Sequence, residues 1–412
     1  MGSKILFLFV IFFLSATPAF ADITVSPGQS IQNAINSSTG KVTVLPGTYA
    51  GFSFSGREVV CSTARTCIIK GGGVIDMNGN NAILRGFVVD GGTVFAGINL
   101  YSGNNLAENN EVRNMIQCPI GQSPGSGGCQ SWADADGFRF FGSNNIMRGN
   151  YIHDNSYANS QNDGSNSPPH IDCFQTWNDS SNHAPAVNTR IEYNICDNYS
   201  ASPYHATSGI ELDDANGTIV SHNIFHTYGK KLDLDTGNSN TTIENNVFLG
   251  GPKTSVMEEY GIFVSEGAGT IVRNNIFYGI LNSGMNIYFK ISGQVTATNN
   301  LLDIDPKLDS TFHPLSGSPV CNTGTSGTFI GVYPCGTTTI IPTPTKTPTP
   351  SPTPTGKPGD ANGDNKVDGV DYVIWLNHYN QTITGGATVG DFNTSGIVDG
   401  VDYVVWLNNF GK

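Results

Sequence analysis

The segment HIDCFQTW, residues 170–177, places groups capable of proton transfer or metal binding on one short apolar run. His170, Asp172 and Gln175 combine an imidazole, a carboxylate and an amide within six positions. A strand of purely structural use would alternate Ser, Thr and Asn with its apolar residues. Closely spaced titratable groups are typical of sites that carry out acid–base chemistry.

A repeated sequence pattern surrounds this segment and predicts how the chain positions it. The repeats consist of alternating apolar residues, an Asn and two further strand-like residues, as in GTIVSHNIF (217–225) and GTIVRNNIF (269–277). The recurring residues are Asn110, Asn150, Asn194, Asn223, Asn246, Asn275 and Asn300. Such a period is typical of a solenoid, and short alternating strands favour an all-β one. We expect the Asn residues to form a structural ladder at turns, where Asn bonds neighbouring backbone and tolerates left-handed geometry.

Alignment of the repeats by their Asn residues predicts two columns of polar side chains. The first column is Asp136, Asp172, Ser208 and Lys230, and the second is Arg139, Gln175, Glu211 and Asp233. His170 lies just before the first column, and these residues, Ser208 excepted, are the candidate catalytic groups. Adjacent coils lie about 4.8 Å apart. Asp136 and Asp172 would therefore repel each other, so one should hold a proton or both should bind a cation.

Two insertions end at the candidate strands. Residues 111–135 and 153–170 lengthen two of the repeats, and insertions on a solenoid commonly form the walls of a binding face. Trp132, Tyr157 and Trp177 lie in or beside them. Their rings could stack on sugars, or pack within the loops.

Three segments give the chain a resemblance to a known superfamily. PGQSIQNAI (27–35) and VTVLPGTY (42–49) resemble the N-terminal cap and first coil of the pectate-lyase-like right-handed parallel β-helices, and LSGSPVCNTG (315–324) resembles their closing segment. The resemblance covers residues 22–335 and implies a right-handed single-stranded parallel β-helix. The superfamily includes lyases, hydrolases, epimerases and binding proteins, so it leaves the activity open.

A polysaccharide lyase acting on a uronate-containing glycan is the favoured function. The reaction needs neutralisation of the uronate and a base, for which Lys230, Lys231 and Arg139 are candidates. A calcium ion held by carboxylates on adjacent coils would bridge an acidic protein to an acidic glycan. DADGF (134–138) is similar to the start of a calcium-binding strand in some β-helical pectate lyases, although their second calcium motif has no clear counterpart.

Two alternatives stay open. A glycoside hydrolase would use Asp136 and Asp172 as acid and base, or as acid and nucleophile, and Glu211, Asp213 or Asp233 could also supply a carboxylate. The pair DC at 172–173 resembles the acidic strand of polygalacturonases, but their Gly-His-Gly and Arg-Ile-Lys motifs are absent. The third class is a non-catalytic glycan-binding or surface protein.

Composition and termini predict an exported protein. Residues 1–21 have the charged start, apolar run and small-residue cleavage site of a secretory signal. No later run is long enough to span a membrane, and 33 Asp and Glu against 20 Lys and Arg argue against a nucleic-acid partner. Eight Cys in an exported chain suggest disulfides. The candidate pairs are Cys61/Cys67, Cys118/Cys129, Cys321/Cys335 and, by a weaker argument, Cys173/Cys196.

Residues 336–358 form a Pro/Thr-rich linker, and the segment 359–412 after it is an internal duplication. DANGDNKVDGVDYVIWLNHY matches DFNTSGIVDGVDYVVWLNNF at an offset of 31 residues. Each copy places oxygen ligands at the spacing of a calcium loop followed by a helix. The first set is Asp360, Asn362, Asp364, the Lys366 carbonyl, Asp368 and Asp371, and the second is Asp391, Asn393, Ser395, the Ile397 carbonyl, Asp399 and Asp402.

The duplicated segment resembles a dockerin, a small α-helical domain with two calcium loops. The resemblance implies calcium-dependent binding to a cohesin domain on a scaffold or cell surface. Ser395 departs from the usual Asp or Asn at its position, so the second site is expected to be the weaker one. We expect Tyr372, Trp375, Tyr403 and Trp406 to pack the core of this small domain.

Overall fold

The computed structural model describes most of the chain outside the termini and several connections. The described residues are 21–92, 95–116, 134–155, 171–179, 181–199, 207–227, 229–250, 260–280, 289–291, 295–335, 357–379, 381, 386–392, 398 and 400–411. Contacts divide the chain into two compact units, Met1–Thr339 and Ile340–Lys412, which are described separately. The predicted signal segment, apart from Ala21, and most of the predicted linker lie outside the described residues.

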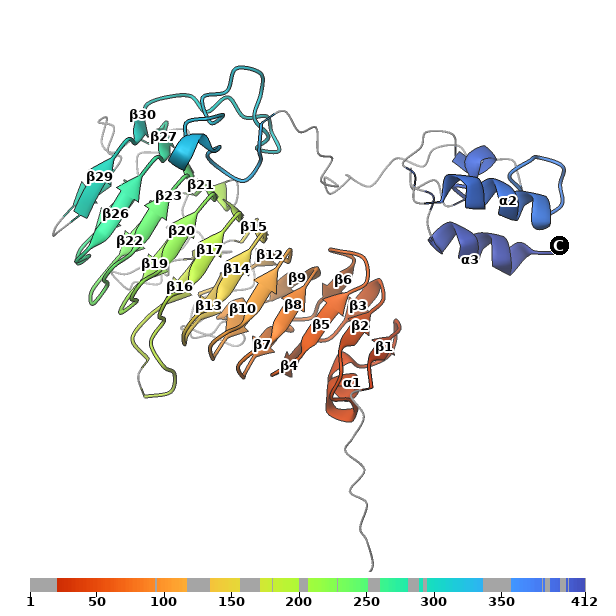
Figure 1. Ribbon diagram of the computed structural model, residues 1–412. Helices are drawn as coiled ribbons and strands as arrows, with labels where there is room; N and C mark the ends of the chain where they lie inside the picture. Colours follow the sequence, from red (N-terminus) through yellow and green to blue (C-terminus); the bar gives the residue numbers. More distant parts are fainter. Residues whose placement is uncertain are drawn as a thin grey trace, which may run out of the picture. The chain divides into compact units, whose positions relative to one another are not determined.

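The first unit is built from three parallel sheets whose strands follow one another in each coil (Figure 1). The eleven-stranded sheet contains β1 (Ile23–Val25), β2 (Val42–Val44), β5 (Glu58–Cys61), β8 (Ile83–Arg85), β11 (Leu106–Glu108), β14 (Ile146–Arg148), β17 (Arg190–Glu192), β20 (Ile219–Ser221), β23 (Thr242–Glu244), β26 (Thr270–Arg273) and β29 (Val295–Thr298). The ten-stranded sheet contains β3 (Gly47–Tyr49), β6 (Cys67–Ile69), β9 (Phe87–Gly92), β12 (Glu111–Met115), β15 (Tyr151–His153), β18 (Ile195–Asp197), β21 (Ile224–His226), β24 (Val247–Leu249), β27 (Ile276–Tyr278) and β30 (Leu301–Leu302). The nine-stranded sheet contains β4 (Phe52–Phe54), β7 (Ile75–Met77), β10 (Ala96–Leu100), β13 (Asp136–Phe140), β16 (Ile171–Thr176), β19 (Thr207–Leu212), β22 (Lys230–Leu234), β25 (Tyr260–Val264) and β28 (Phe289–Ile291).

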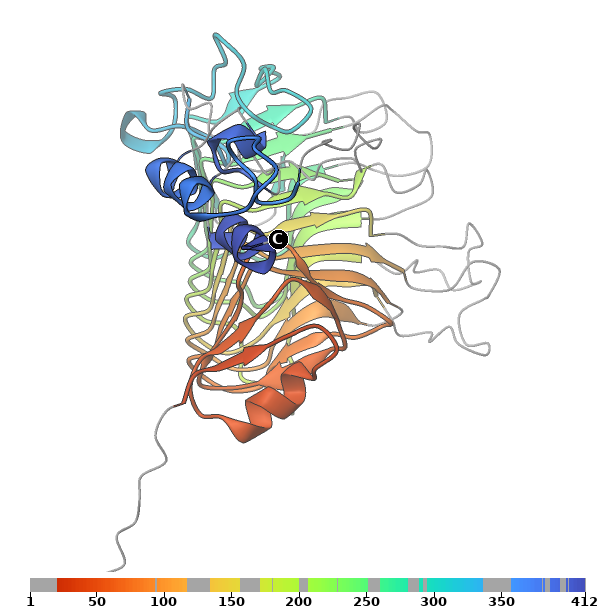
Figure 2. The same cartoon turned by 90° about the vertical axis from the view of Figure 1, so that its right-hand side faces the viewer.

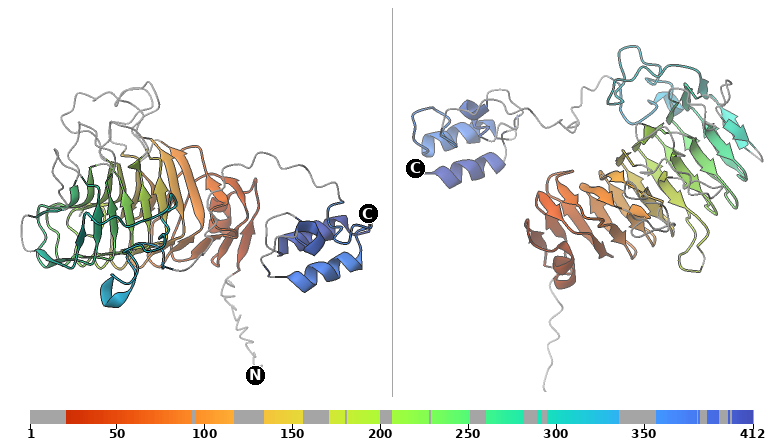
Figure 3. Two further views of the ribbon diagram at one scale, coloured as in Figure 1. Left: turned by 90° about the horizontal axis from the view of Figure 1, so that it is seen from above. Right: turned by 180° about the vertical axis from the view of Figure 1, so that it is seen from behind.

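This arrangement is a parallel β-helix, consistent with the right-handed form that the sequence predicts (Figure 3). Alternating side chains of all three sheets fill its interior, where equivalent residues of successive coils stack on one another. The rings of Phe225, Phe248 and Phe277 lie 5.3 and 4.7 Å apart along one such stack. At the N-terminal end, helix α1 (Ile31–Ser37) lies across the coil stack and buries Ile31 on it (Figure 2).

The predicted Asn ladder is present inside one corner of the coils. Asn194 donates to Asn223 Oδ1 both through its backbone N–H, at 2.9 Å, and through Nδ2, at 3.0 Å. Asn223 Nδ2 donates in turn to the Ile191 carbonyl at 2.8 Å. The same bonds link the Asn residues at 110, 150, 194, 223, 246, 275 and 300. Each buried amide thereby satisfies polar groups of two neighbouring coils.

The expected left-handed geometry occurs one residue earlier than the ladder. The positions before the seven ladder residues are Asn109, Gly149, Tyr193, His222, Asn245, Asn274 and Asn299, with φ between 52 and 63°. The ladder Asn therefore serves through its amide, while the preceding residue makes the turn. Tyr193 and His222 also stack across coils at 4.8 Å, which helps a bulky residue to hold a strained conformation.

Three of the four candidate disulfides are formed. They are Cys61–Cys67, Cys173–Cys196 and Cys321–Cys335, while Cys118 and Cys129 lie outside the described residues. The Cys173–Cys196 bond crosses the interior and joins β16 of the nine-stranded sheet to β18 of the ten-stranded sheet. It therefore ties the candidate strand to the coil that follows it.

The last part of the first unit folds back over the ten-stranded sheet. Val320 and Ile330 pack on Ile224, Val247 and Ile276, which face outward from β21, β24 and β27. The short 3-10 turn η2 (Thr325–Gly327) lies in this segment, and Thr325 N donates to Asn245 Oδ1 at 2.8 Å. This apolar layer covers the outer face of β21, β24 and β27 with part of the segment that resembles the closing segment of the superfamily.

The second unit contains helices α2 (Gly369–His378) and α3 (Gly400–Asn409) and the short turn η3 (Gly386–Val389). As expected, its aromatic residues pack together: Tyr372 lies 5.1 Å from Trp406 and Trp375 lies 5.2 Å from Tyr403, between ring centroids. Within the described part of the chain, no helix is both long enough and apolar enough to span a membrane.

We predict that Asn223→Ala lowers the free energy of unfolding by about 3 kcal/mol, because it leaves several buried backbone and amide groups without partners. Urea denaturation of the full chain measures this change. Asn36→Ala on α1 is the control, since this exposed amide bonds only Gln32 among described residues and should change stability by less than about 0.5 kcal/mol. Equal changes in the free energy of unfolding for the two substitutions would contradict a stabilising role of the Asn ladder.

Candidate active site

The outer face of the nine-stranded sheet carries the two predicted columns. The second column is in register as expected, with Arg139 beside Gln175, Gln175 beside Glu211, and Glu211 beside Asp233. In the first column Asp172 pairs with Ser208, and Asp172 N donates to Asp136 Oδ1 at 2.9 Å. The sequence repeat therefore brings these residues from separate coils onto one face.

A bend in the strands lets residues three positions apart share that face. In a regular strand Asp136 and Arg139 would point to opposite sides. A Cβ on Gly137 would instead lie 2.8 Å from Ile152 Cγ2 in the interior, and Phe138 also points inward. Because two consecutive residues face the core, the residues on either side of them both face outward.

The carboxyl group of Asp136 is fully buried beneath this face. Burial raises the pKa of Asp136 well above its ordinary value, and the charges of Asp172 and Asp134 add to the rise while Arg139 opposes it. Protonation of Asp136 relieves the repulsion that the sequence predicts for two adjacent carboxyls.

The Arg139 side chain contacts two carboxyl groups and two aromatic rings, and the residue is only 5% exposed. Its Nε donates to Asp136 Oδ2 at 2.9 Å, and it also pairs with Asp134. The guanidinium carbon lies 4.3 Å from the centre of the Phe95 ring and 4.8 Å from that of Trp177. These contacts make Arg139 a residue that holds the neighbouring carboxyls, and they leave it little room to act as a base.

Lys230 and Asp233 form a second pair three positions apart, with the charges reversed relative to Asp136 and Arg139. The Lys230 side chain is 38% exposed, and its ammonium lies 4.6 Å from the centre of the Phe263 ring. Burial raises the pKa of Asp233, although the hydrogen bond from Lys230 lowers it in part. Lys230 is therefore a cation that a ligand on this face can reach.

The remaining candidate residues differ in burial, and some of them lie outside the described residues. Gln175 is buried and Glu211 half-buried, both on the outward column, and Asp172 is fully buried beside Asp136. His170, Trp132 and Tyr157 lie outside the described residues. Trp177 packs against Phe141 at 4.7 Å, so its ring serves as packing.

Lys231, a candidate base in the sequence, points into the interior. Its side chain is fully buried and its Nζ donates to the Thr227 carbonyl. It occupies the same inward column as Gly137, which explains why neighbouring lysines have opposite orientations. A substrate on the outer face cannot reach it.

Phe95, Phe263 and Tyr260 belong to this face but escaped the sequence reasoning. Lys230 pairs in register with Tyr260, and the Tyr260 ring lies 5.5 Å from that of Phe263. The coils of these aromatics end at the ladder residues Asn110 and Asn275, but the columns were aligned only over the coils that end at Asn150, Asn194, Asn223 and Asn246. Asp233 lies 13 residues before Asn246, but the same count back from Asn275 reaches Ile262, one residue short of Phe263, which pairs with Asp233.

The first calcium-loop sequence of the second unit folds as a compact turn. Asp360 accepts hydrogen bonds from Gly363 N at 2.7 Å and Asn365 N at 2.8 Å. Asn365 has φ of 64°, the sharp turn expected at that position. Asp371 Oδ1 accepts from Ala361 N at 2.8 Å, so the first and last ligand residues face the same loop backbone.

The donor set of this loop suits calcium by its chemistry, because Asn362 and the Lys366 carbonyl add oxygens to those of the carboxylates. Counting only His, Cys, Asp and Glu, no group of three in the described residues is placed to hold a metal ion. Of the second loop only Asp391 and Asp402, both buried, are described. Asn393, Ser395, Ile397 and Asp399 lie outside the described residues.

Comparison with known proteins finds similarity in solved structures alone. No protein-family model and no curated protein matches the chain. The PL6 family alginate lyase AlyGC has 13% identity and a TM-score of 0.47, over 68% of this chain and 38% of that one. A mannuronic acid specific polysaccharide family 6 lyase from human gut microbiota has 14% identity and a TM-score of 0.43, over 69% of this chain and 83% of that one.

Pectate lyase Pel9A is similar over 77% of this chain and 97% of its own length, with 13% identity and a TM-score of 0.36. The chain thus spans little more than a third of AlyGC and nearly all of Pel9A. Likenesses at this distance concern the parallel β-helix fold alone.

We predict that Asp136→Asn flattens the pH dependence of stability. An unfolded Asp ionises near pH 3.9, whereas folded Asp136 keeps its proton to higher pH. As pH rises through this window the unfolded state loses its proton first, so the wild type loses stability and the variant loses less. Calorimetric melting temperatures between pH 4 and 8 measure the slopes.

Asp309→Asn is the control of opposite sign. Burial alone would raise the pKa of Asp309, but hydrogen bonds from His313 and Thr311 lower it overall. Its carboxylate therefore stabilises the fold above the unfolded pKa, and this variant should lose stability at neutral pH. Identical slopes for Asp136→Asn and the wild type would mean that Asp136 is ionised in the folded protein.

Proposed function

We propose that the chain is a secreted polysaccharide lyase that cleaves a uronate-containing glycan on the outer face of its nine-stranded sheet. The observation that carries this function is the contrast between its two cations. Arg139 is buried in ion pairs, whereas Lys230 is exposed beside a carboxyl group whose pKa is raised. An accessible amine next to a proton-accepting group suits abstraction of the proton α to a uronate carboxylate.

The acidic character of the face supports a calcium ion in binding. Gln175 and Glu211 are paired on neighbouring strands of this face, and carboxylate and amide oxygens are the ligands that calcium prefers. When bound there, the ion would neutralise the uronate carboxylate and make its α-proton more acidic.

Residues of the chain have separate roles in the proposed elimination reaction. Asp136, which accepts a hydrogen bond from Arg139, also accepts one from the Asp172 N–H and so positions Asp172 from the preceding coil. Lys230 takes the α-proton, the electron pair of that C–H bond forms the new double bond, the bond to the leaving oxygen breaks, and that oxygen takes a proton from water. Asp233 contacts the Lys230 amine and can receive the proton afterwards.

A glycoside hydrolase is the second candidate. Asp136 with its raised pKa and the adjacent Asp172 resemble an acid paired with a second carboxylate. Both side chains are fully buried, however, which keeps them from a glycosidic oxygen. Burial therefore favours the lyase.

The second unit is proposed to dock the enzyme through a calcium-dependent, dockerin-like surface onto a cohesin domain of a scaffold or cell surface. Its helices expose large apolar side chains at matching positions of the two copies. Leu376 and Leu407 are 50 and 51% exposed, and Tyr379 and Phe410 are 44 and 53% exposed. Exposed apolar residues arranged twice in this way are typical of a protein-binding surface.

We predict that the full chain generates ultraviolet-absorbing unsaturated ends together with reducing ends on a uronan, and that a chelator abolishes both. Lys230→Ala should reduce kcat by about 100-fold or more, because a general base contributes roughly 10²–10⁴ in rate. Lys70→Ala is the matched control, a half-exposed lysine whose ammonium lies 3.4 Å from Asp90 on the ten-stranded sheet.

Each other outcome selects another function. Reducing ends without absorbance would establish hydrolysis and overturn the lyase. Neither signal on any acidic or neutral polysaccharide, with glycan binding retained, would make the β-helix a binding protein.

We predict that Asp360→Ala removes one calcium site from the second unit. Isothermal titration of the full chain with calcium should lose one equivalent, because Asp360 is the first ligand of its loop. Asp305→Ala, at an exposed carboxylate of the first unit, should leave the stoichiometry unchanged. Equal stoichiometry in Asp360→Ala and the wild type would count against a calcium site in this loop.

A further inference from the structure

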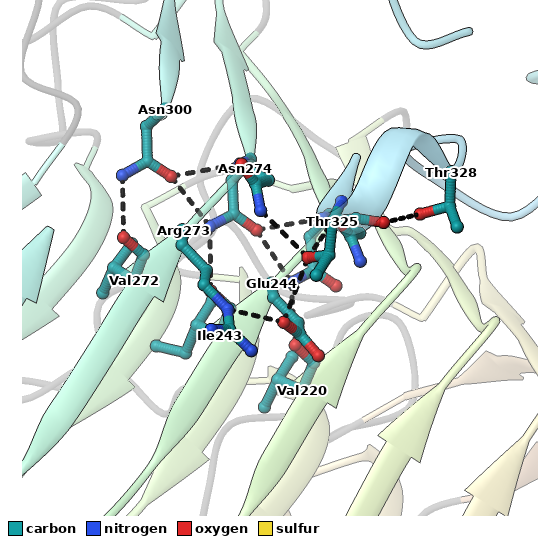
Figure 4. Close-up of polar contacts among 12 residues, drawn as sticks. Val220, Ile243, Glu244, Val272, Arg273, Asn274, Asn300, Thr325 and Thr328 are labelled. Atoms are coloured by element: carbon teal, nitrogen blue, oxygen red, sulfur yellow. Dashed lines mark hydrogen bonds and ion pairs between the residues drawn. The ribbon is translucent and has the colours of Figure 1, made fainter. Parts of the chain in front are cut away.

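A hollow of about 690 Å³ lies at the C-terminal end of the β-helix, apart from the nine-stranded sheet. Residues 298–301 of the last coil form one wall, and residues 323–326 of the returning segment form another. Its size is within the roughly 300–1,000 Å³ of small-molecule sites. Asn274 Nδ2 donates to Thr325 Oγ1 at 2.9 Å and so joins the two walls (Figure 4).

The Asn ladder ends at this hollow. In the preceding rung, Asn275 donates to Asn300 Oδ1 through its backbone N–H at 3.1 Å and through Nδ2 at 3.0 Å. Asn300 has no following Asn, and its side chain donates to the Val272 carbonyl at 2.9 Å (Figure 4). Among described residues, its backbone N–H and second amide hydrogen have no acceptor. These two donors therefore lie where the Oδ1 atom of a further Asn would continue the ladder.

Arg273 lines the same hollow with half of its guanidinium uncommitted. Its Nε donates to Glu244 Oε2 at 2.8 Å, and Thr325 Oγ1 donates to the same oxygen at 3.2 Å (Figure 4). Within the part of the chain that the structure describes, the Nη1 and Nη2 groups make no hydrogen bond. The Arg273 side chain is 40% exposed. A guanidinium edge of this kind binds a carboxylate in two-point fashion.

We propose that this hollow is a second, non-catalytic glycan site that binds a carboxylated sugar residue. The sugar carboxylate lies against Arg273 and the unpaired donors of Asn300. The exposed side chains of Thr298 and Ser326 bond the ring hydroxyls. Glu244 is already bonded to Arg273 and Thr325, so its charge is largely offset and does not repel the ligand.

Hydrogen–deuterium exchange of the full chain tests this site, with trigalacturonate and trimannuronate as acidic probes and galactotriose as the neutral one. The peptide containing residues 295–303 should become protected with an acidic probe, because the Asn300 N–H gains an acceptor. Arg273→Gln should weaken the fitted affinity at this peptide at least 10-fold.

Arg148→Gln is the matched control, since Arg148 bonds Glu192 in the same column of the eleven-stranded sheet, with 41% exposure, and lies away from the hollow. It should leave the affinity unchanged. No protection by millimolar acidic probe, or equal protection by galactotriose, would overturn the proposal. The readout needs no cleavage, so the loss of this site and the absence of lyase activity are told apart.

Discussion

The structure depends on the requirement that each coil repeat the backbone path of the one before it. Parallel strands bond coil to coil, so any residue position recurs beside its equivalent at a spacing of about 4.8 Å. The Asn ladder is the clearest consequence, because each amide bonds the backbone and side chain of a neighbouring coil within a buried corner. Replacing one ladder Asn would leave buried polar groups of the two neighbouring coils without hydrogen-bond partners.

The same requirement builds the candidate active site. Stacking carries Asp136, Asp172 and Lys230, which come from separate coils, onto one sheet edge, and the bend beside Gly137 is stacked in the same way. Because the bend recurs, the columns before and after it face outward together. The Asp136–Arg139 and Lys230–Asp233 pairs follow directly from that geometry.

Burial then separates residues that look alike. Arg139 and Lys230 are both cations beside carboxylates, yet one is enclosed by two carboxyls and two rings while the other is open to ligands. Asp136 and Asp233 share a raised pKa with the same principal cause, removal from water. The face therefore combines two carboxyls of raised pKa with a reachable amine, which suits an acidic glycan better than carboxyls of ordinary pKa would.

Periodicity in the sequence predicted a β-solenoid, the ladder residues and the register of the second column, the family resemblance predicted the parallel β-helix, and cysteine spacing suggested three of the disulfides. These features depend on local pattern and on repetition, which a sequence displays directly. The sequence did not place the left-handed residue correctly, since the pattern marks Asn223 while the turn itself is made by His222. Nor did it reveal that Lys231 points inward, because strand alternation gives no warning of a bend.

Tertiary structure alone decided which polar groups are accessible to a ligand and which are buried in contacts that stabilise the fold. Phe95 and Trp177 enclose Arg139 from different coils, and the returning segment meets Arg273 at the end of the ladder. These contacts join residues tens of positions apart through side-chain packing that follows no repeat. The sequence by itself determined the coil and the column of each residue, and the packed structure determined its exposure and charge.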